Sequence, residues 1–309
     1  MLVVFVKHFN KIWMNGKFVR FEDAKVHVLC HSLHYGNAVF EGMRCYNTEK
    51  GPAVFRLREH LNRLFNSAKA YMIEIPYSKN ELRKAALDLM RVNRVKECYI
   101  RPIAFYGPEH MGLEPEGLKV NVAIVPVPWG SYFGDKIERG VRAKISSWCR
   151  INPLIVPPQA KCAGNYANSL LAKMEATKSG YDEAILQNIS GYIAEGPGEN
   201  IFIVRQGKLI TPPVHAGILI GVTRDSVMRI ARDMGIEVII RDIPREELYI
   251  ADEAFFTGTA AEITPIVEVD DRAIADGRRG PITQKLQAKF FDVLRGKDER
   301  YYEWLEFVG

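Results

Sequence analysis

Cysteine is scarce in this chain. The 309 residues include five cysteines, an odd and scattered set in which no two form a CxxC pair. Such a set argues against a disulfide framework and against a zinc site, and it favours a reducing cytoplasm. Long apolar runs are missing too, because none approaches the roughly 18 residues of a membrane span. The apolar start at residues 1–6 is too short for a signal-peptide core. We therefore expect a cytoplasmic protein that holds no metal and contacts no membrane.

An excess of charge is also lacking. The formal net charge is +5, with no basic block and no interleaving of basic and aromatic residues. This distribution argues against nucleic-acid binding, although a mildly positive field suits anionic substrates and a phosphate-bearing cofactor. The motifs GxGxxG and GxxxxGK[ST] are absent from the sequence. Their absence argues against a dinucleotide-binding enzyme and an ATP-dependent one.

The first part of the chain has the patterns of a small mixed domain. The whole sequence is 47% apolar and 26% charged, which is ordinary for a globular protein long enough for about two domains. An Asn-Gly pair between apolar flanks predicts a hairpin over 12–19. Apolar periodicity predicts helices over 58–74 and 78–92, the second opened by a capping box of Ser78 and Glu81. With strands expected at 97–106 and 118–127, residues 1–126 are predicted to form a small N-terminal α/β domain.

A Pro- and Gly-rich stretch separates this domain from the rest. Residues 127–134 contain Trp129 and Tyr132 among turn-forming residues and are predicted to be an interdomain loop. Residues 135–309 are predicted to form a larger, strand-rich C-terminal domain. Its helices are expected at 165–179, 223–234 and 281–295. Its strands are expected at 140–149, 182–188, 192–196, 200–205, 208–211, 236–243, 253–257 and 263–270. Many strands with short turns and few helices indicate an α+β fold.

Two residues in the second half suggest covalent cofactor chemistry. Lys161 precedes a predicted helix, and Glu195 opens the stretch EGPGENIF at 195–202. Lysine amines form Schiff bases with carbonyl compounds, of which pyridoxal 5′-phosphate (PLP) is the commonest partner. PLP in turn needs an acidic partner at its pyridine nitrogen, because a protonated ring withdraws electrons from the substrate's alpha carbon. Either residue alone is more often a solvated surface charge.

Two further patterns fit such a site. Gly221, Val222 and Thr223 open a predicted helix, and a helix N-terminus binds phosphate through its free N–H groups and dipole. A simple N-cap role for Thr223 is compatible with this. Tyr99 and Arg101 stand two residues apart on a predicted strand, so both side chains face the same way.

Taken together, these motifs resemble the branched-chain amino acid aminotransferases, members of the PLP fold type IV group whose fold is like that of D-amino acid aminotransferase. The resemblance runs through HYG at 34–36, VFEGMR at 39–44, EHLNR at 59–63, YIRP at 99–102, PWG at 128–130, Lys161, NY at 165–166, EG at 195–196, GEN at 198–200, GVTR at 221–224 and GTAAE at 258–262. It implies a two-domain α+β chain that binds PLP.

The resemblance also assigns roles around the cofactor. It implies that Lys161 holds PLP and moves the proton between the alpha carbon and the cofactor, while Glu195 holds the ring nitrogen. Arg63 matches the phosphate-binding arginine, for which the plain alternative is a solvated helix charge. The other implied cofactor contacts are Tyr166, Leu219, Val222, Thr223 and Thr259.

On the substrate side, one pocket must accept an apolar side chain and also the side chain of glutamate. The resemblance implies that Tyr99, with the N–H groups of Thr259 and Ala260, binds the alpha-carboxylate. Arg101 takes the distal carboxylate of glutamate. Aromatic walls with polar tips suit such double duty. The remaining implied pocket residues are Tyr35, Phe40, Trp129, Tyr132 and Tyr166, together with Leu113, which is expected to reach the pocket of a partner subunit.

The expected reaction is transamination of leucine, isoleucine or valine with 2-oxoglutarate by a homodimer or a higher homo-oligomer. Its small-molecule partners are amino acids and 2-oxo acids. A D-amino acid or (R)-amine transaminase on the same fold is an alternative, as is a PLP lyase. A catalytically silent phosphate-binding protein is the alternative outside enzymology.

Overall fold

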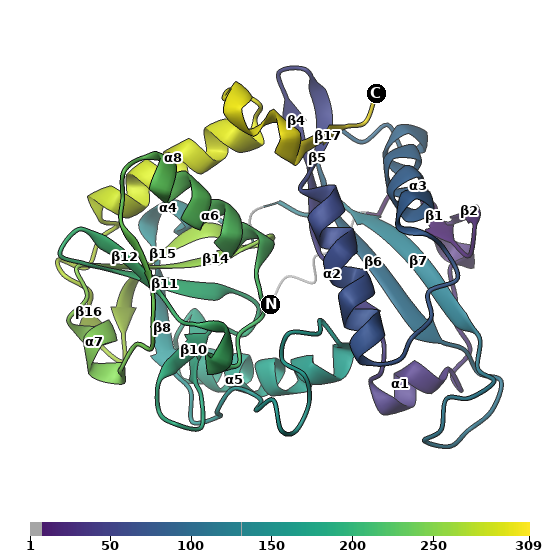
Figure 1. Cartoon of the computed structure of the whole chain (residues 1–309), viewed down its shortest axis with the longest axis horizontal. Helices are drawn as coiled ribbons and strands as arrows, with labels where there is room; N and C mark the ends of the chain where they lie inside the picture. The colour runs from purple at the N-terminus through teal and green to yellow at the C-terminus, as the bar shows by residue number, and fades with distance from the viewer. Residues whose placement is uncertain (1–7, 131) are drawn as a thin grey trace. The chain divides into compact units, whose positions relative to one another are not determined.

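A computed structural model describes residues 8–130 and 132–309. The expectation about residues 1–6 and the Ser131 position of the predicted interdomain loop lie outside these residues. The chain divides into two compact units. The first unit contains residues 1–130, 160–164 and 292–309, and the second contains 131–159 and 165–291 (Figure 1). The domain boundaries at 126 and 135 stay a prediction.

An antiparallel sheet forms the centre of the first unit. Its strands lie in the order β17-β5-β4-β6-β7-β1-β2, with β3 paired to β6. The long pair β6–β7 follows a continuous register from Tyr99 opposite Val127 to Tyr106 opposite Val120. The strands are β1 (Lys11–Met14), β2 (Lys17–Arg20), β3 (Val39–Phe40), β4 (Met43–Thr48), β5 (Gly51–Phe55), β6 (Cys98–Tyr106), β7 (Val120–Val127) and β17 (Leu305–Phe307).

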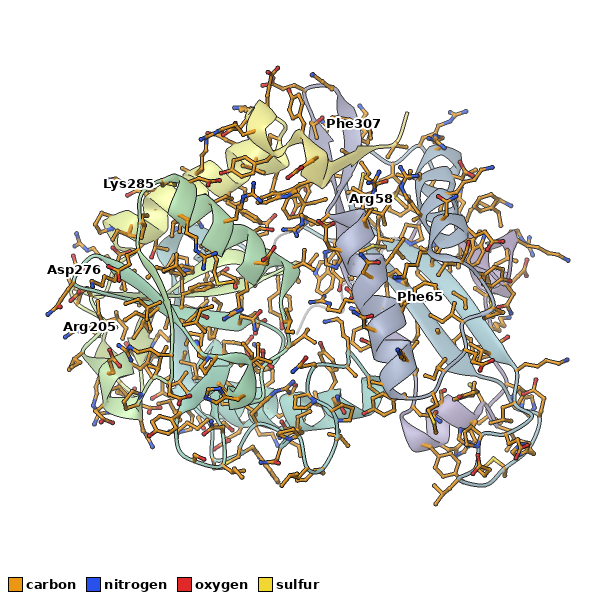
Figure 2. All side chains as sticks on the ribbon, viewed as in Figure 1. Arg58, Phe65, Arg205, Asp276, Lys285 and Phe307 are labelled. Carbon is orange, nitrogen blue, oxygen red and sulfur yellow. The ribbon has the colours of Figure 1, made fainter. Side chains whose placement is uncertain are left out.

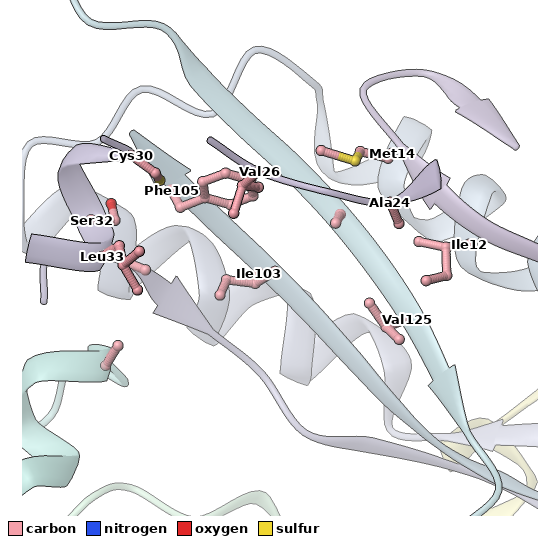
Figure 3. A pocket seen from close by; sticks show the side chains of 13 residues that line it. Ile12, Met14, Ala24, Val26, Cys30, Ser32, Leu33, Ile103, Phe105 and Val125 are labelled. Atoms are coloured by element: carbon pink, nitrogen blue, oxygen red, sulfur yellow. The ribbon is translucent and has the colours of Figure 1, made fainter. Parts of the chain in front are cut away.

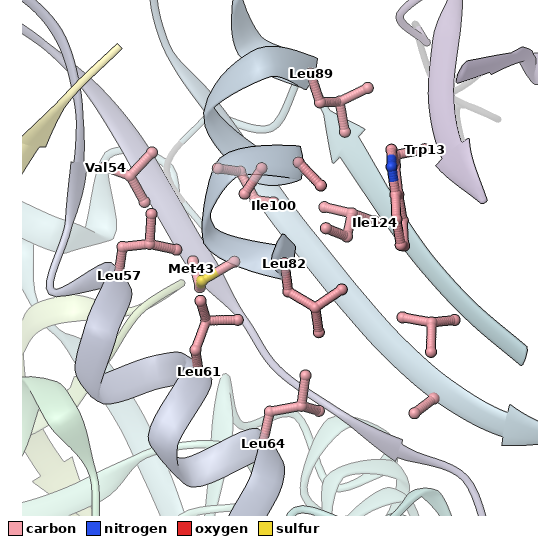
Figure 4. Packing of buried hydrophobic residues seen from close by; sticks show 14 of the residues in the cluster. Trp13, Met43, Val54, Leu57, Leu61, Leu64, Leu82, Leu89, Ile100 and Ile124 are labelled. Atoms are coloured by element: carbon pink, nitrogen blue, oxygen red, sulfur yellow. The ribbon is translucent and has the colours of Figure 1, made fainter. Parts of the chain in front are cut away.

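Two amphipathic helices cover one face of this sheet. Helices α2 (Leu57–Ala70) and α3 (Lys79–Val92) pack against each other and against the strands. Their leucines meet Met43, Ile100 and Ile124 in one buried cluster (Figure 4). The expected capping box at Ser78 opens α3. On the solvent side of α2, Arg58 (Figure 2) pairs with Glu306 of β17 at 3.0 Å.

The opposite face of the sheet carries an apolar pocket. Side chains alternate along β6, so Ile103 and Phe105 point away from the helices and share a face with Tyr99 and Arg101. A cavity of about 370 Å³ lies over this face (Figure 3). It has no charged residue and none of the predicted site residues in its lining, which consists of Ile12, Met14, Ala24, Val26, Cys30, Ser32, Leu33, Ala38, Ile103, Phe105, Ala123, Val125 and Ala163.

The second unit is a closed barrel with an extension. Its sheet has the order β10-β9-β8-β15-β14-β11-β12-β13, and an additional pairing of β10 with β11 closes the first six strands into a ring. Closure removes the exposed edges that an open sheet would leave. The strands are β8 (Val141–Ile145), β9 (Glu183–Gln187), β10 (Ile193–Glu195), β11 (Asn200–Arg205), β12 (Lys208–Thr211), β13 (Val238–Ile240), β14 (Glu253–Gly258), β15 (Glu262–Val269) and β16 (Arg272–Ala273), the last pairing with β15.

Helices pack around this barrel. Helix α5 packs on β8 and β9, and helix α6 packs on β13 and β14. The helices are α4 (Lys136–Arg139), α5 (Tyr166–Lys178), α6 (Val222–Asp233), α7 (Arg245–Tyr249) and α8 (Pro281–Leu294), the last of which runs into the first unit. Within the described residues, no helix is both long and apolar enough to cross a membrane.

Most expected elements are confirmed, including the hairpin at 12–19 and the helices that became α3, α5, α6 and α8. The helix predicted over 58–74 ends earlier, at Ala70, because the chain turns at Tyr71 and Met72 takes a positive φ of 53°. The sequence patterns did not predict α1 (His31–Tyr35), α4, α7, β3, β4, β5, β16 or β17.

Candidate active site

Lys161 lies on a short segment held against β3 in the first unit. The Phe40 N–H donates to the Lys161 carbonyl at 3.0 Å, and the Lys161 N–H donates to Ser67 Oγ at 2.9 Å. Further along, the Gly164 N–H donates to the Gly36 carbonyl at 2.7 Å. Gly36 has a φ of +68°, and a Cβ there would lie 3.0 Å from the Gly164 Cα. Two glycines therefore permit the close approach that fixes the backbone of Lys161.

An aromatic and cationic group surrounds this lysine within the same unit. The Lys161 ammonium lies 5.1 Å from the centre of the Phe40 ring, and the Arg101 guanidinium lies 4.7 Å from the same ring. Arg101 donates to the Tyr99 hydroxyl at 3.0 Å, and Tyr99 meets Trp129 edge to face at 5.0 Å. These five predicted site residues are thus brought together. Arg101 Nε is buried without a hydrogen-bond partner among the described residues, which suits the capture of an anion.

Tyr35 and Leu113 belong to a different neighbourhood of the first unit. Tyr35 packs on the His31 ring at 4.5 Å, and His31 Nε2 contacts the Gly112 carbonyl at 2.7 Å. This histidine therefore links the Tyr35 helix to the loop that carries Leu113. No hydrogen bond joins Tyr35 to Arg101 in the described chain. Leu113 is 80% exposed, so it does not line a pocket of its own first unit.

Arg63 is held by a buried carboxylate. Its Nε and Nη2 donate to the two oxygens of Glu41 at 2.5 and 2.8 Å, and His60 Nδ1 contacts Glu41 Oε2 at 2.8 Å. Burial alone would raise the pKa of Glu41, but the Arg63 guanidinium and then His60 hold it well below its ordinary value. Burial also lowers the pKa of His60. The arginine is therefore a fixed cation rather than a mobile surface side chain.

In the second unit, Glu195 lies at the end of β10 in a dense set of donors. Arg150 Nε lies 2.8 Å from Glu195 Oε1, and Asn200 Nδ2 donates to Oε2 at 2.9 Å. The Leu219 N–H also points at the carboxylate, 3.2 and 3.1 Å from its two oxygens. Arg150 and Glu195 are both buried. These contacts fix the carboxylate in its charged form and in one orientation.

The N-terminus of α6 lies next to this carboxylate. Leu219 donates to Glu195, and its own carbonyl accepts from Asn200 at 2.8 Å. Gly221 is the N-cap of α6, and a Cβ there would lie 1.9 Å from Asn200 Oδ1. Val222 and Thr223 form the buried first turn. The first turn of a helix can bind an anion through its N–H groups, and phosphate binding by this turn stays a prediction.

Four other predicted residues lie elsewhere in the second unit. Thr259 and Ala260 form the turn between β14 and β15. Tyr166 is the first residue of α5. The pKa of Tyr132 is raised by burial and then by Glu199 and Glu183, so its hydroxyl stays protonated and remains a donor.

Three supporting residues were missed at the sequence level. Arg150 follows β8 in a segment without a motif, and no pattern linked it to Glu195. Glu41 and Asn200 did lie in quoted motifs, at 39–44 and 198–200, yet neither was given a role. The buried Glu41 carboxylate pairs with Arg63, and the buried Asn200 amide donates to Glu195.

The donor sets fit a PLP-like group. Such a cofactor needs an amine for its aldehyde, an acid for its ring nitrogen, and N–H groups with a cation for its phosphate. Within the first unit, Lys161 has an amine and Arg63 is a fixed cation. Within the second unit, Glu195 is a buried acid and the first turn of α6 presents N–H groups. Thr257 Oγ1 adds a buried hydroxyl without a partner among the described residues, opposite Asn200 in the β11–β14 pair.

Known proteins resemble this chain closely. The family model for class IV amino-transferases matches residues 38–269. The branched-chain-amino-acid aminotransferase of Escherichia coli strain K12 is 47% identical over 305 residues, which cover 98% of this chain and 99% of the relative. A crystal structure of the branched-chain amino acid aminotransferase of Escherichia coli matches with a TM-score of 0.96 at 47% identity, covering 97% of this chain and 100% of the other. The branched-chain amino acid aminotransferase of Thermobaculum terrenum, in its PLP-bound holo form, matches with a TM-score of 0.92 at 38% identity, covering 98% and 99%.

Proposed function

This chain belongs to the class IV aminotransferase family, and from that premise we propose that it is a PLP-dependent branched-chain amino acid transaminase. It transfers the amino group of leucine, isoleucine or valine to 2-oxoglutarate, giving the branched-chain 2-oxo acid and L-glutamate. The near full-length likeness to branched-chain aminotransferases supports the reaction. The observation that carries the chemistry is the buried Glu195 carboxylate, oriented by Arg150, Asn200 and the Leu219 N–H.

Each half of the cofactor site has a distinct task. PLP, when bound, supplies an electron sink that stabilises negative charge at the substrate's alpha carbon. Glu195 keeps a proton on the ring nitrogen, because a fixed carboxylate favours the cationic form of a neighbouring base. The first turn of α6 in the second unit would bind a phosphate dianion through its N–H groups, and the Arg63 guanidinium of the first unit would pair with one.

Lys161 is the proposed catalytic residue. Hydrogen bonds to Phe40 and Ser67 fix its backbone on both sides, so the Cα from which the side chain extends has a defined position. Its amine would hold the aldehyde of the cofactor and, when free, would accept and return the proton of the substrate's alpha carbon.

The aromatic and cationic group around Lys161 explains how one pocket serves two kinds of substrate. Phe40 and Trp129 offer apolar faces to a branched side chain. Tyr99 and Arg101 offer a hydroxyl and a guanidinium to carboxylates. Arg101 stacks on the Phe40 ring, so the cation can lie flat against an apolar wall until a distal carboxylate arrives.

We further propose that the chain acts in the cytoplasm as a homodimer. All five cysteines are free, which suits a reducing compartment. Val26 and Leu33 line the apolar pocket of the first unit and are 53% and 64% exposed. Exposed apolar residues beside a pocket are typical of a protein–protein contact, which a second copy of the chain would supply.

The decisive experiment is Lys161→Ala. We expect no transamination between L-leucine and 2-oxoglutarate, while the circular dichroism spectrum and the melting temperature stay near those of the wild type. Borohydride reduction should attach the cofactor to the wild-type chain at Lys161 and leave the variant unlabelled. Near-normal activity of the variant would refute the assignment.

Enantiomers of leucine separate the main proposal from its alternatives. We expect conversion of L-leucine only in the presence of a 2-oxo acid acceptor. Conversion of D-leucine alone would identify a D-amino acid transaminase. Release of ammonia without an acceptor would identify a lyase.

A further inference from the structure

Glu199 carries a carboxyl group that the proposed chemistry does not use. It lies immediately before β11, four positions after Glu195, and is 6% exposed. Its Oε2 accepts a hydrogen bond from the Gly198 N–H at 3.1 Å, and among the described residues it makes no ion pair. A buried carboxylate without a cation is strongly disfavoured relative to the neutral acid.

The turn between β10 and β11 is shaped around this carboxyl group. The Gly196 N–H donates to the Glu199 carbonyl at 2.7 Å and closes the turn. A Cβ at Gly196 would lie 2.8 Å from Glu199 Oε2, and a Cβ at Gly258 would lie 3.6 Å from Glu199 Cγ. The absence of a side chain at Gly196 therefore leaves room for the Glu199 carboxyl group, whereas a Cβ at Gly258 would make only an ordinary van der Waals contact with Glu199.

The same turn fixes the ring-binding carboxylate. Glu195 and Asn200 are direct cross-strand partners, and Asn200 Nδ2 donates to Glu195 Oε2 at 2.9 Å. Asn200 is the first residue of β11 and Glu199 directly precedes it, so the two side chains leave adjacent positions of the same backbone. Displacement of Glu199 would move the backbone that places Asn200 against Glu195.

The charged neighbours of Glu199 come from three other segments. Burial raises the pKa of Glu199 to about 8, with help from Glu183 and Glu195, while the Gly198 N–H and Lys173 act in the opposite direction. Glu183 has the Lys173 amine at 2.8 Å and the Ala184 N–H at 3.0 Å. Because a cation and an N–H group lie beside its carboxylate, Glu183 is better placed than Glu199 to carry the negative charge.

The fourth neighbour is Tyr132, which precedes α4. Its pKa is raised by burial and then by Glu199 and Glu183. It is therefore uncharged near neutral pH and supplies no cation to Glu199.

We propose that Glu199 is a positioning residue for Glu195 and that it holds the turn between β10 and β11 together as an uncharged carboxylic acid. This inference rests on the proposed function, because Glu195 matters only if it holds the cofactor ring. Ionisation of Glu199 places a second negative charge in the same turn and drives the side chain out of its gap. Glu195 then loses its fixed orientation, which sets an alkaline limit on the site.

The first test uses the cofactor-free protein and infrared spectroscopy. We expect the carbonyl band of a buried, protonated carboxyl group at about pH 6, and its loss as the pH rises through about 8. Glu199→Gln should remove the band. Glu183→Gln, the matched control, should keep it at about pH 6 and lower its midpoint. The absence of a wild-type band, or a band that survives Glu199→Gln but not Glu183→Gln, would overturn the proposal.

The second test measures the unfolding of the same cofactor-free proteins against pH. A group whose folded pKa is raised contributes stability that is lost as the pH rises from its unfolded pKa towards its folded one. The ratio of the wild-type unfolding constant to that of Glu199→Gln should therefore rise about tenfold per unit between about pH 5 and about pH 7. A ratio independent of pH would overturn the proposal.

The third test links the acid to the reaction. In the PLP-loaded protein, the alkaline limb of kcat/KM should have its midpoint near pH 8 and move to higher pH in Glu199→Gln. A purely structural role would lower kcat/KM equally at every pH, and an unmoved limb would overturn the proposal. If Lys161→Ala still transaminates, the proposed function fails. The two cofactor-free tests would still decide whether the Glu199 carboxyl group is protonated.

Discussion

The ion pair between Glu41 and Arg63 should be a main support of the first unit, and Glu41→Gln tests this. Glu41 is fully buried and accepts two hydrogen bonds from Arg63 and one contact from His60. Removal of one partner leaves the Arg63 charge uncompensated in a nearly buried position. Such removal costs about 3–5 kcal/mol in other proteins, and we expect a loss of that size in the free energy of unfolding of the first unit.

Urea denaturation of the cofactor-free protein measures this loss. The chain has four tryptophans, of which Trp148 alone belongs to the second unit. A Trp148→Phe background therefore makes fluorescence report on the first unit. The expected result is a lower midpoint with an unchanged slope against denaturant.

Asp88→Asn is the matched control. Asp88 pairs with Arg91, and the two side chains are 32% and 47% exposed. Exposed pairs contribute about 0–1 kcal/mol, so the control should change little. If Glu41→Gln loses no more than this control, the buried pair does not stabilise the unit and the reasoning fails.

The same pair predicts a pH dependence. The pKa of Glu41 is held below its ordinary value by Arg63 and His60, against the effect of burial. Its contribution is therefore present above the unfolded pKa and disappears as the pH falls towards the folded pKa. The stability gap between the wild type and Glu41→Gln should narrow below about pH 4, and a gap that widens there would contradict this sign.

Three further substitutions test the site itself. Glu195→Gln should lower kcat roughly 100-fold or more, because a neutral amide cannot hold the ring proton; wild-type rates would assign the electron sink elsewhere. Arg101→Met should lower kcat/KM for glutamate roughly 100-fold more than for leucine, and equal losses would reject its role with the distal carboxylate. Gly221→Ala should displace Asn200, whose Oδ1 would lie 1.9 Å from the new Cβ, and so weaken PLP binding and lower the melting temperature. Gly198→Ala is its control, because a Cβ there meets nothing within 4 Å, and equal losses in both variants would exclude crowding as the cause.

Sequence patterns predicted the elements whose periodicity is local. The amphipathic helix α3 and its Ser78 capping box followed directly from spacing. The strand β17 was not predicted, because it forms by pairing with β5, which lies far away in the sequence. Closure of the barrel by the β10–β11 pair could not be predicted from the sequence either. The register between strands depends on tertiary contacts, which no local pattern contains.

The candidate site likewise contains residues that local motifs predict and residues that only the fold brings together. Residues inside motifs, such as Lys161 and Glu195, could be named in advance. Arg150 could not, because an arginine after a strand is ordinarily a surface charge and only the fold brings it within 2.8 Å of Glu195. The resemblance implied that Tyr35 lines the substrate pocket, and this stays a prediction; in the structure Tyr35 packs on His31.

The chain crosses from one unit to the other four times, at 130/131, 159/160, 164/165 and 291/292. No single cut can therefore release either unit as one uninterrupted polypeptide. A protein truncated after Gly130 would lack both the reactive amine and the strand that covers the edge of β5. During synthesis on the ribosome, the edge of β5 stays open until residues 305–307 have emerged, so the first sheet is completed only after the whole second unit has been made.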